Sequence, residues 1–226
     1  MGAVYRDRMS EQIHISPARV LRELVPASAW EGLAGFPRRP HPAGAVLLHQ
    51  GESGSHVLAL LRGIVKVVRG DRDGRERLLA FRGPGEVLGE VAVQDGGVRL
   101  AHVRTLSRCE VSVIPAAAFR DFVTRHDLAF QLALHAVSRL REQTQSCEGD
   151  IDQRLAATLL RLIEISGARS FSLTRDELAQ HLGVGRNSIT KALERFGSHR
   201  VSFGRTRIEV LDEAYLSRLL DCRAAT

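Results

Sequence analysis

Two short helical segments separated by one glycine, near the C-terminal end, limit the fold more than any other part of this sequence. Thr174 and Glu177 form a Thr-x-x-Glu capping box, which predicts a helix over residues 175–182. Gly183 then supplies a left-handed turn residue, and a second helix is predicted from about 186 to 196. Their apolar residues recur at helical spacing, so each helix has one inward face. Two short helices joined by a tight glycine turn predict a helix-turn-helix.

This motif is typical of DNA-binding proteins, in which the second helix enters the major groove. Arg186 and Asn187 are the candidate base readers, because arginine can bond guanine O6 and N7 and asparagine can bond adenine N6 and N7. Ser188 and Arg175 suit phosphate contacts, which position the protein without reading sequence. The other candidates lie on the outward face of the second helix or on a predicted basic β-hairpin, the wing, over 200–211: Thr190, Lys191, Arg195, Arg200, Arg205 and Arg207. A purely structural helical hairpin is the alternative.

The charge distribution agrees with a nucleic-acid surface. The chain has 226 residues and a formal net charge of +6. Residues 186–207 hold six basic side chains and one acidic one, so five of those net charges fall in the predicted second helix and wing. The alternative is a solvated face enriched in arginine by base composition, since all but two of the 32 basic residues are arginine.

The region from about 44 to 115 predicts an all-β domain. Short apolar runs rich in β-branched residues alternate with glycines at regular spacing, which is typical of a sandwich or barrel. Gly63 and the pair Asp73-Gly74 are hairpin-turn signals. A short helix is expected from about Pro17 to Leu24, after a loose polar tail over 1–16.

The segment after this β domain predicts a long helix, since residues 116–147 contain no glycine or proline. Ala133, Val137, Leu140 and Thr144 form one stripe on it. Long helices with such a stripe often pair with a copy of themselves, and packing on the chain's own β domain is the alternative. The fold class is therefore α+β, an all-β sandwich or barrel followed by a long helix and a helix-turn-helix with a wing. The expected divisions are a tail (1–16), the β domain (17–115), the long helix (116–148) and the DNA-binding domain (149–226).

Three segments resemble the cyclic-AMP receptor protein/FNR family of bacterial transcription regulators. LLHQGESGSHVLALLRGIVKVV is similar to the first strands of that family, GPGEVLGEVAVQDGGVRLAHV to its phosphate-binding cassette, and RLAATLLRL through ITKALERF to its DNA-binding domain. The resemblance implies that the β domain is a sensor built as a jelly-roll-like β-roll of the cyclic-nucleotide-binding type, and that the long helix is a dimerisation helix that pairs two copies. It further implies that an effector is held between β-roll and helix. It also implies double-stranded DNA with a palindromic operator as a partner, together with RNA polymerase, and no required cofactor.

The resemblance places the effector site on named residues. Gly89 and Glu90 match the ribose-binding residues, and Arg99 matches the phosphate-binding one. Leu100 departs from the pattern, because cyclic-AMP binders usually have Ser or Thr there. Arg139, Gln143 and Thr144 lie where the family contacts phosphate and base. The implied effector is a cyclic nucleotide (cAMP, cGMP or a cyclic dinucleotide). The alternatives are an empty cassette with a Glu90–Arg99 salt bridge, and a ligand-independent DNA binder with a vestigial sensor.

Other functional classes fit the sequence poorly. A cupin-type metal enzyme would need clustered His and Glu ligands, so no enzyme activity and no metal are expected. Three scattered cysteines, no apolar leader and no long apolar run predict a cytoplasmic protein without a membrane span. Haem sensing would use histidines, but hydrogen-bonded or surface roles suit the candidates better: His41, His49, His56 and His102. Cys147 is either a redox switch or a small buried hydrophobe.

Overall fold

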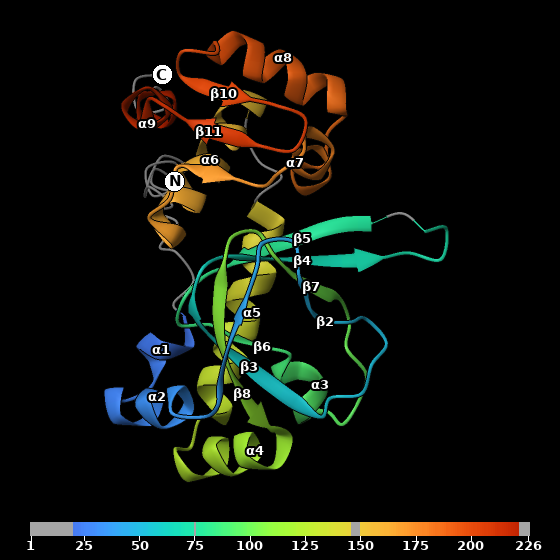
Figure 1. Ribbon diagram of the computed structural model, residues 1–226, viewed down its shortest axis with the longest axis vertical. Coiled ribbons are helices and arrows are strands. Elements are labelled where there is room, and N and C mark those ends of the chain that lie inside the picture. The colour runs from blue at the N-terminus through green and yellow to red at the C-terminus, as the bar shows by residue number, and fades with distance from the viewer. Residues whose placement is uncertain (1–19, 75, 146–149, 222–226) are drawn as a thin grey trace, which may run out of the picture.

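The computed structural model describes residues 20–74, 76–145 and 150–221. Two short helices, α1 (Leu21–Leu24) and α2 (Ala27–Ala34), precede a β-roll, and a C-terminal domain follows two further helices (Figure 1). This architecture confirms the predicted α+β class. The predicted N-terminal helix is shorter than expected within the described residues, and α2 was not predicted although Trp30 and Leu33 on it are buried. The tail over 1–16 lies outside the described residues.

Two four-stranded antiparallel sheets form the β-roll, with strand orders β1-β8-β3-β6 and β2-β7-β4-β5. The strands are β1 (Arg38–His41), β2 (Val46–Leu48), β3 (His56–Arg62), β4 (Val65–Gly70), β5 (Glu76–Arg82), β6 (Val87–Leu88), β7 (His102–Thr105) and β8 (Cys109–Pro115). Strand β3 is apolar on both faces. Leu58 and Leu60 join the core between the sheets, whereas Val57 and Ala59 face the core that includes α1 and α2. Because successive side chains point to opposite faces, a continuous apolar run is what a strand buried on both sides requires.

The two predicted turns have different outcomes. Asp73 and Gly74 join β4 to β5, which pair antiparallel, so that hairpin is confirmed. The hairpin predicted at Gly63 is wrong. Strand β3 pairs with β6 and β8, whereas β4 pairs with β5 and β7, so Gly63 carries the chain from one sheet to the other. Its φ of +86° explains the glycine, since other residues rarely adopt that region.

The single long helix expected after the β-roll is also wrong, because the segment contains two helices. Helix α4 (Ala116–Arg125) ends before Asp127, which has a φ of +49°, and α5 (Ala129–Gln145) begins after it. Aspartate tolerates the left-handed region better than most residues, so the break needs neither glycine nor proline. Helix α4 covers one end of the β-roll, and α5 runs along it towards the C-terminal domain (Figure 1).

The C-terminal domain confirms the predicted helix-turn-helix. It comprises α6 (Ile151–Ser166), α7 (Arg175–Leu182), α8 (Arg186–Phe196), α9 (Glu213–Asp221) and a sheet of β9 (Ser170–Phe171), β10 (Val201–Phe203) and β11 (Ile208–Val210). Both halves of the Thr174–Glu177 capping box are formed, and Gly183 is left-handed with a φ of +63°. The wing hairpin of β10 and β11 lies where the sequence predicts it. Strand β9 and helix α9 were not predicted.

The β-roll and the C-terminal domain share one hydrophobic cluster. Phe81 of β5 packs against His181 of α7, with ring centroids 5.0 Å apart. Lys66 of β4 forms an ion pair with Glu177, the capping-box carboxylate at the start of α7. Helix α7 therefore rests on the β-roll, and α8 lies on the far side of the C-terminal domain (Figure 1).

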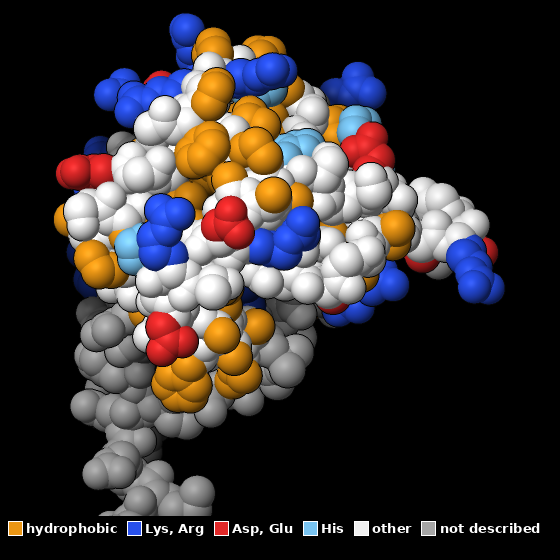
Figure 2. Space-filling view, turned by 90° about the horizontal axis from the view of Figure 1, so that it is seen from below, with side chains coloured by type: hydrophobic (Ala, Val, Ile, Leu, Met, Phe, Trp, Pro, Cys, Tyr) orange, Lys and Arg blue, Asp and Glu red, His pale blue; other side chains and the backbone are white. Residues whose placement is uncertain are grey.

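The end of the molecule opposite α8 has a surface of mixed charge. Basic, acidic and uncharged side chains alternate across it, with hydrophobic groups between them (Figure 2). This face therefore offers no broad surface of one sign for a nucleic-acid backbone, in contrast to the basic helix and wing at the other end.

Candidate functional site

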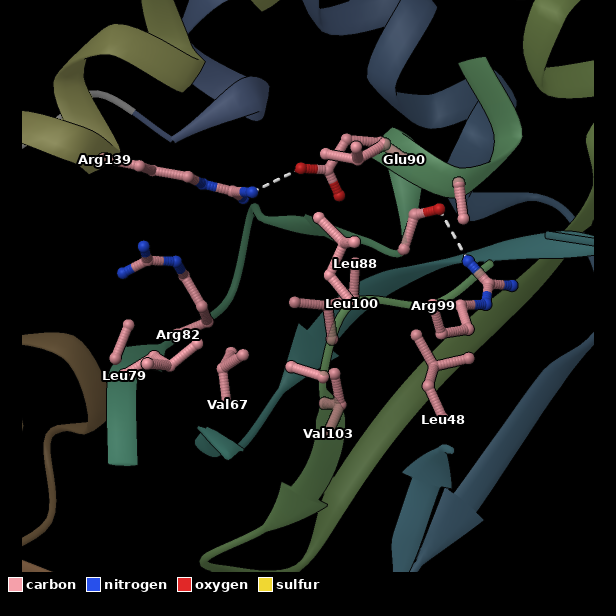
Figure 3. A pocket seen from close by; sticks show the side chains of 15 residues that line it. Leu48, Val67, Leu79, Arg82, Leu88, Glu90, Arg99, Leu100, Val103 and Arg139 are labelled. Carbon is pink, nitrogen blue, oxygen red and sulfur yellow. Dashed lines mark hydrogen bonds and ion pairs between the residues drawn. The ribbon is translucent and has the colours of Figure 1, made fainter. Parts of the chain in front are cut away.

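A cavity of about 240 Å³ lies between the β-roll and α5. Its middle is apolar, and charged side chains stand at its edges (Figure 3). The apolar lining includes Leu48, Val67, Leu88 and Val103, and the charged lining is Arg82, Glu90, Arg99 and Arg139. Small-molecule sites usually measure about 300–1,000 Å³, so this cavity suits a small ligand with polar ends.

Gly89 and Arg99 form one edge of the cavity. Arg99 is only 3% exposed, and its Nη1 donates to the Gly89 carbonyl at 2.6 Å while its Nη2 donates to the His56 carbonyl. Gly89 has a φ of +83°, and a β-carbon there would overlap Arg99 Nη1. Burial lowers the pKa of Arg99 below its ordinary value. Gly89 and Arg99, which the resemblance assigns to the same effector site, are therefore in direct contact, and the close approach of backbone to guanidinium explains the glycine.

Glu90, at the start of α3 (Glu90–Gln94), pairs with Arg139 on α5 rather than with Arg99. The alternative of a Glu90–Arg99 salt bridge in the cassette is therefore wrong for this structure. Arg139 Nη2 also lies 2.8 Å from Glu86 Oε2. The two carboxylates raise the pKa of Arg139 against the effect of its burial. Arg139 lines the cavity as predicted, but its guanidinium binds two carboxylates and so ties the β-roll to α5.

Glu86 is the centre of a buried ionic network that sequence reasoning missed. His135 Nε2 lies 3.2 Å from Glu86 Oε2, and Arg82 Nε lies 3.8 Å from Glu86 Oε1. Burial alone would raise the pKa of Glu86, but His135, Arg139 and Arg82 outweigh it and lower the pKa to about 2. The four side chains come from β5, the loop before β6, and α5. Their spacing in the sequence gives no signal, because only the fold brings them together.

Leu100 lines the cavity and is 58% exposed. It follows Arg99 directly, so an apolar side chain occupies the position where a hydroxyl donor was expected. Gln143 and Thr144 belong to α5, but their side chains lie outside the described residues, so their assignment to the site stays a prediction. Cys147 also lies outside the described residues.

The recognition helix α8 presents its predicted residues on the outer face. Ile189, Ala192, Leu193 and Phe196 are fully buried, which leaves the opposite side to solvent. The exposed candidates are Arg186, Asn187, Ser188, Lys191, Arg195, Arg205 and Arg207, and Thr190 is half-buried. The exposed positions at the N-terminal end of α8 match the part of a recognition helix that meets base edges.

Several of the remaining candidates have partners within the domain. Arg175 stacks on Phe203 and Arg200 on Tyr215, with 4.6 Å and 4.1 Å between guanidinium and ring centre. Arg207 Nε donates to Ser170 Oγ at 2.7 Å. These contacts hold the wing against the rest of the domain, and each of them uses a basic side chain. Arg195 pairs with Asp152 of α6, which raises the pKa of Arg195.

Both the β-roll and the C-terminal domain match known protein families. Residues 38–126 match the cyclic nucleotide-binding domain, and residues 153–219 match the Crp-like helix-turn-helix domain. The CRP-like cAMP-activated global transcriptional regulator of Mycobacterium tuberculosis is 30% identical over 171 residues, which covers 70% of this chain and 76% of the relative. The cAMP-activated global transcriptional regulator CRP of Escherichia coli is 28% identical over 166 residues, covering 68% of this chain and 79% of the relative.

The chain belongs to the Crp/Fnr family. Its fold is also similar to that of a CRP/FNR-family transcriptional regulator from Thermus thermophilus. The TM-score is 0.64 at 23% identity, over 82% of this chain and 98% of that one. Members of this family are transcription regulators, so the helix-turn-helix of this member is a DNA-binding domain and its β-roll is a cyclic nucleotide-binding domain.

Two of the histidines considered as haem ligands in this Crp/Fnr member form hydrogen bonds within the described part of the chain. His102 Nδ1 accepts a hydrogen bond from the Gln50 backbone at 3.2 Å, and His56 Nδ1 lies 3.0 Å from Ser55 Oγ. Among the described residues, no three His, Cys, Asp or Glu side chains gather as a metal site requires. Within the same residues, every helix is too short or too polar to cross a membrane.

Proposed function

We propose that this chain is a homodimeric, sequence-specific regulator of transcription, without enzyme activity, that a cyclic nucleotide in the β-roll cavity controls. The observation that carries the proposal is the Glu90–Arg139 pair, because it joins the cavity edge to α5. A ligand at this edge acts directly on the contact between sensor and helix. The relatives from Mycobacterium tuberculosis and Escherichia coli are named as cAMP-activated, which supports a cyclic nucleotide as the effector.

The cavity residues have distinct roles in this proposal. The Arg99 guanidinium attracts the cyclic phosphate, and the left-handed backbone at Gly89 gives that anion room to approach. Glu90 accepts a hydrogen bond from a ribose hydroxyl, in competition with Arg139. Leu100 covers the ligand from the outer side, and the family resemblance assigns contacts with phosphate and base to Gln143 and Thr144. Release of Arg139 from Glu90 shifts α5 between two arrangements, which couples effector binding to DNA binding.

The exposed face of α5 supports the proposed homodimer. Phe130 is 69% exposed, and Leu134 and Val137 are also largely exposed at spacings of four and three residues. An apolar stripe at this spacing is typical of a helix that pairs with its copy. In the DNA-competent dimer, two α8 helices lie about 34 Å apart, in successive major grooves of a palindromic operator.

DNA reading is assigned to the exposed end of α8, and backbone contact to its flanks. Arg186 and Asn187 read bases, with Lys191 one turn further on. Phosphates are contacted from α7, α8 and the wing by Arg175, Ser188, Thr190, Arg195, Arg200, Arg205 and Arg207. RNA polymerase is the further partner, since regulation of transcription acts through it.

The test of effector control is operator binding titrated with cAMP, cGMP and cyclic dinucleotides. We expect one of these nucleotides to change the affinity of the wild type for its operator. The same nucleotide should bind at least about tenfold more weakly to Gly89→Ala than to the wild type. Gly96→Ala is the matched control, because Gly96 also has a positive φ but a β-carbon there has open space. An equal loss in both variants would remove the Gly89–Arg99 edge from the effector site.

The test of DNA reading is Arg186→Ala. We expect this variant to relax base preference at one position in each half-site, at a cost of about 1–3 kcal/mol per contact. Binding-site selection from random operators measures that preference. An unchanged preferred sequence would exclude Arg186 as a base reader.

A ligand-independent regulator is the second candidate. Leu100 favours it, since it cannot donate to a phosphate, and so do the two carbonyl groups that already accept from Arg99. Operator binding that stays constant across the nucleotide series, together with no direct nucleotide binding, would select this candidate.

A further inference from the structure

Asp176 places a carboxylate beside the candidate base reader Arg186. It lies in the first turn of α7, and its Oδ2 is 3.5 Å from Nη1 of Arg186, the first residue of α8. Helix α8 lies on the side of the C-terminal domain away from the β-roll, where the proposed function has DNA bind (Figure 1). An acidic group at this position needs an explanation, because DNA carries a negative charge at every nucleotide.

The neighbouring acid, Glu177, already meets the structural needs of this helix end. Its carboxylate accepts hydrogen bonds from the backbone N–H and the hydroxyl of Thr174, and it pairs with Lys66 of β4. Glu177 thereby completes the capping box and supplies a negative charge where the helix dipole favours one. The side chain of Asp176 is 56% exposed and lies beside Arg186 instead. Its carboxylate is therefore available to act on the DNA-binding face.

The Asp176–Arg186 pair is loose. Its 3.5 Å separation exceeds the roughly 2.7–2.9 Å of a strong charged hydrogen bond, and more than half of each side chain is exposed. Exposed pairs of this kind add little to folding stability. The carboxylate nevertheless competes with any phosphate for the guanidinium, since both are anions and like charges repel each other. Arg186 can leave Asp176, but another anion approaches Arg186 only against this repulsion.

Phosphate and guanine respond differently to this carboxylate. A phosphate is charged and is present at every nucleotide, so Asp176 repels it whatever the sequence. The guanine edge is uncharged, and its O6 and N7 accept hydrogen bonds from two donors of one guanidinium. A repulsive element that weakens the common contact more than the correct one raises specificity.

We propose that Asp176 is a specificity-determining residue, which withholds Arg186 from the phosphate backbone so that Arg186 strengthens binding only where a guanine is present. Arg186 is the residue that binds the base, and Asp176 acts through it. This inference rests on the proposed function for the base-reading role of Arg186.

The experiment measures how tightly the full-length protein binds two duplexes of equal length, by fluorescence anisotropy at several salt concentrations. One duplex carries the operator that binding-site selection prefers, and the other carries an unrelated sequence. We expect Asp176→Asn to bind the unrelated duplex more tightly, with a slope of log affinity against log salt that is steeper by about one for each Arg186 that gains a phosphate. The operator should gain less, so the ratio of the two affinities should fall about three- to tenfold.

Glu164→Gln is the matched control. It removes the same charge from an exposed position near the end of α6, next to Ile165, which packs against Gly83 of the β-roll, so the ratio of affinities should be unchanged. Asp176→Glu is the second variant, because it keeps the carboxylate and should keep most of the wild-type ratio. A merely structural role of Asp176 in α7 would change stability in urea but would not change this ratio.

Arg186→Ala separates the two proposals. If Asp176 acts through Arg186, the ratio of affinities in Arg186→Ala should be the same with and without Asp176→Asn. A wild-type ratio in Asp176→Asn, or an equal fall in the Arg186→Ala background, would overturn the role of Asp176 and leave base reading by Arg186 standing. An unchanged preferred sequence in Arg186→Ala would overturn base reading by Arg186 itself, and the role of Asp176 with it.

Discussion

The arginines of the cavity and those of the recognition helix are the same side chain in opposite environments. Arg99 is 3% exposed and donates to two backbone carbonyls, whereas the side chain of Arg186 is 61% exposed and lies 3.5 Å from Asp176. Burying a guanidinium is costly unless protein groups compensate it, so the cavity fixes its geometry before any ligand arrives. An exposed arginine keeps its water and its rotamers, and it can adjust to phosphates and bases. Pre-organisation suits a small ligand, and adaptability suits a long polymer.

The largest expected effect on stability is at Glu86, and it tests whether this buried carboxylate compensates the side chains around it. Glu86→Ala leaves Arg82, His135 and Arg139 around a buried space without their shared carboxylate, and should lower the free energy of unfolding by about 3–5 kcal/mol. Glu110→Ala is the control, because Glu110 lies 3.8 Å and 3.9 Å from two exposed arginines, and it should cost less than about 1 kcal/mol. Urea unfolding measures both. Equal small losses would contradict the contrast between buried and exposed charges.

A smaller effect is expected at His181, where the β-roll and the C-terminal domain meet. Burial and the charges of Arg161, Arg82 and Arg154 lower the pKa of His181 to about 4. The unfolded chain protonates this histidine below its ordinary pKa of 6.5, whereas the folded chain keeps it neutral down to about 4. The contribution of neutral His181 to the free energy of unfolding is therefore complete above pH 6.5. This contribution is lost as the pH falls, by about 2 kcal/mol between pH 7 and 5.

His181→Gln should remove this part of the pH dependence of unfolding, while His199→Gln, at an exposed position, should retain it. Urea unfolding at pH 7, 6 and 5 makes the comparison. A wild type whose stability is constant over this range would show that α7 does not stay docked on β5 in solution.

The smallest effect is expected for a single exposed arginine of the wing. Arg205→Ala should weaken binding to all DNA sequences alike and reduce the slope of log affinity against log salt by about one, since one phosphate contact is lost. Arg108→Ala, exposed on the β-roll, is the control and should leave the slope unchanged. Sequence-dependent loss in Arg205→Ala would instead make this residue a base reader.

Local patterns in the sequence were enough to predict the helix-turn-helix. Thr174, Glu177 and Gly183 act through contacts within a few residues, so their roles were readable without a fold. The same holds for the buried face of α8. The break between α4 and α5 was not predictable in this way, because Asp127 adopts a left-handed conformation that carries no composition signal. The turn at Gly63 was recognised, but which strands pair across it depends on the whole sheet.

By itself, the sequence determined the order of an all-β domain, helices and a helix-turn-helix with a wing, because periodicity, caps and turn residues encode such features locally. The assignment of Gly89, Arg99 and Arg139 to one effector site came from the resemblance to the Crp/Fnr family. Only the tertiary structure decided that Glu90 pairs with Arg139, that Glu86 lies beside Arg82, His135 and Arg139, and that Arg82 and Arg99 line the same cavity. These pairings join residues from distant segments, and their partners are selected by burial and charge in a space that exists only after the chain has folded.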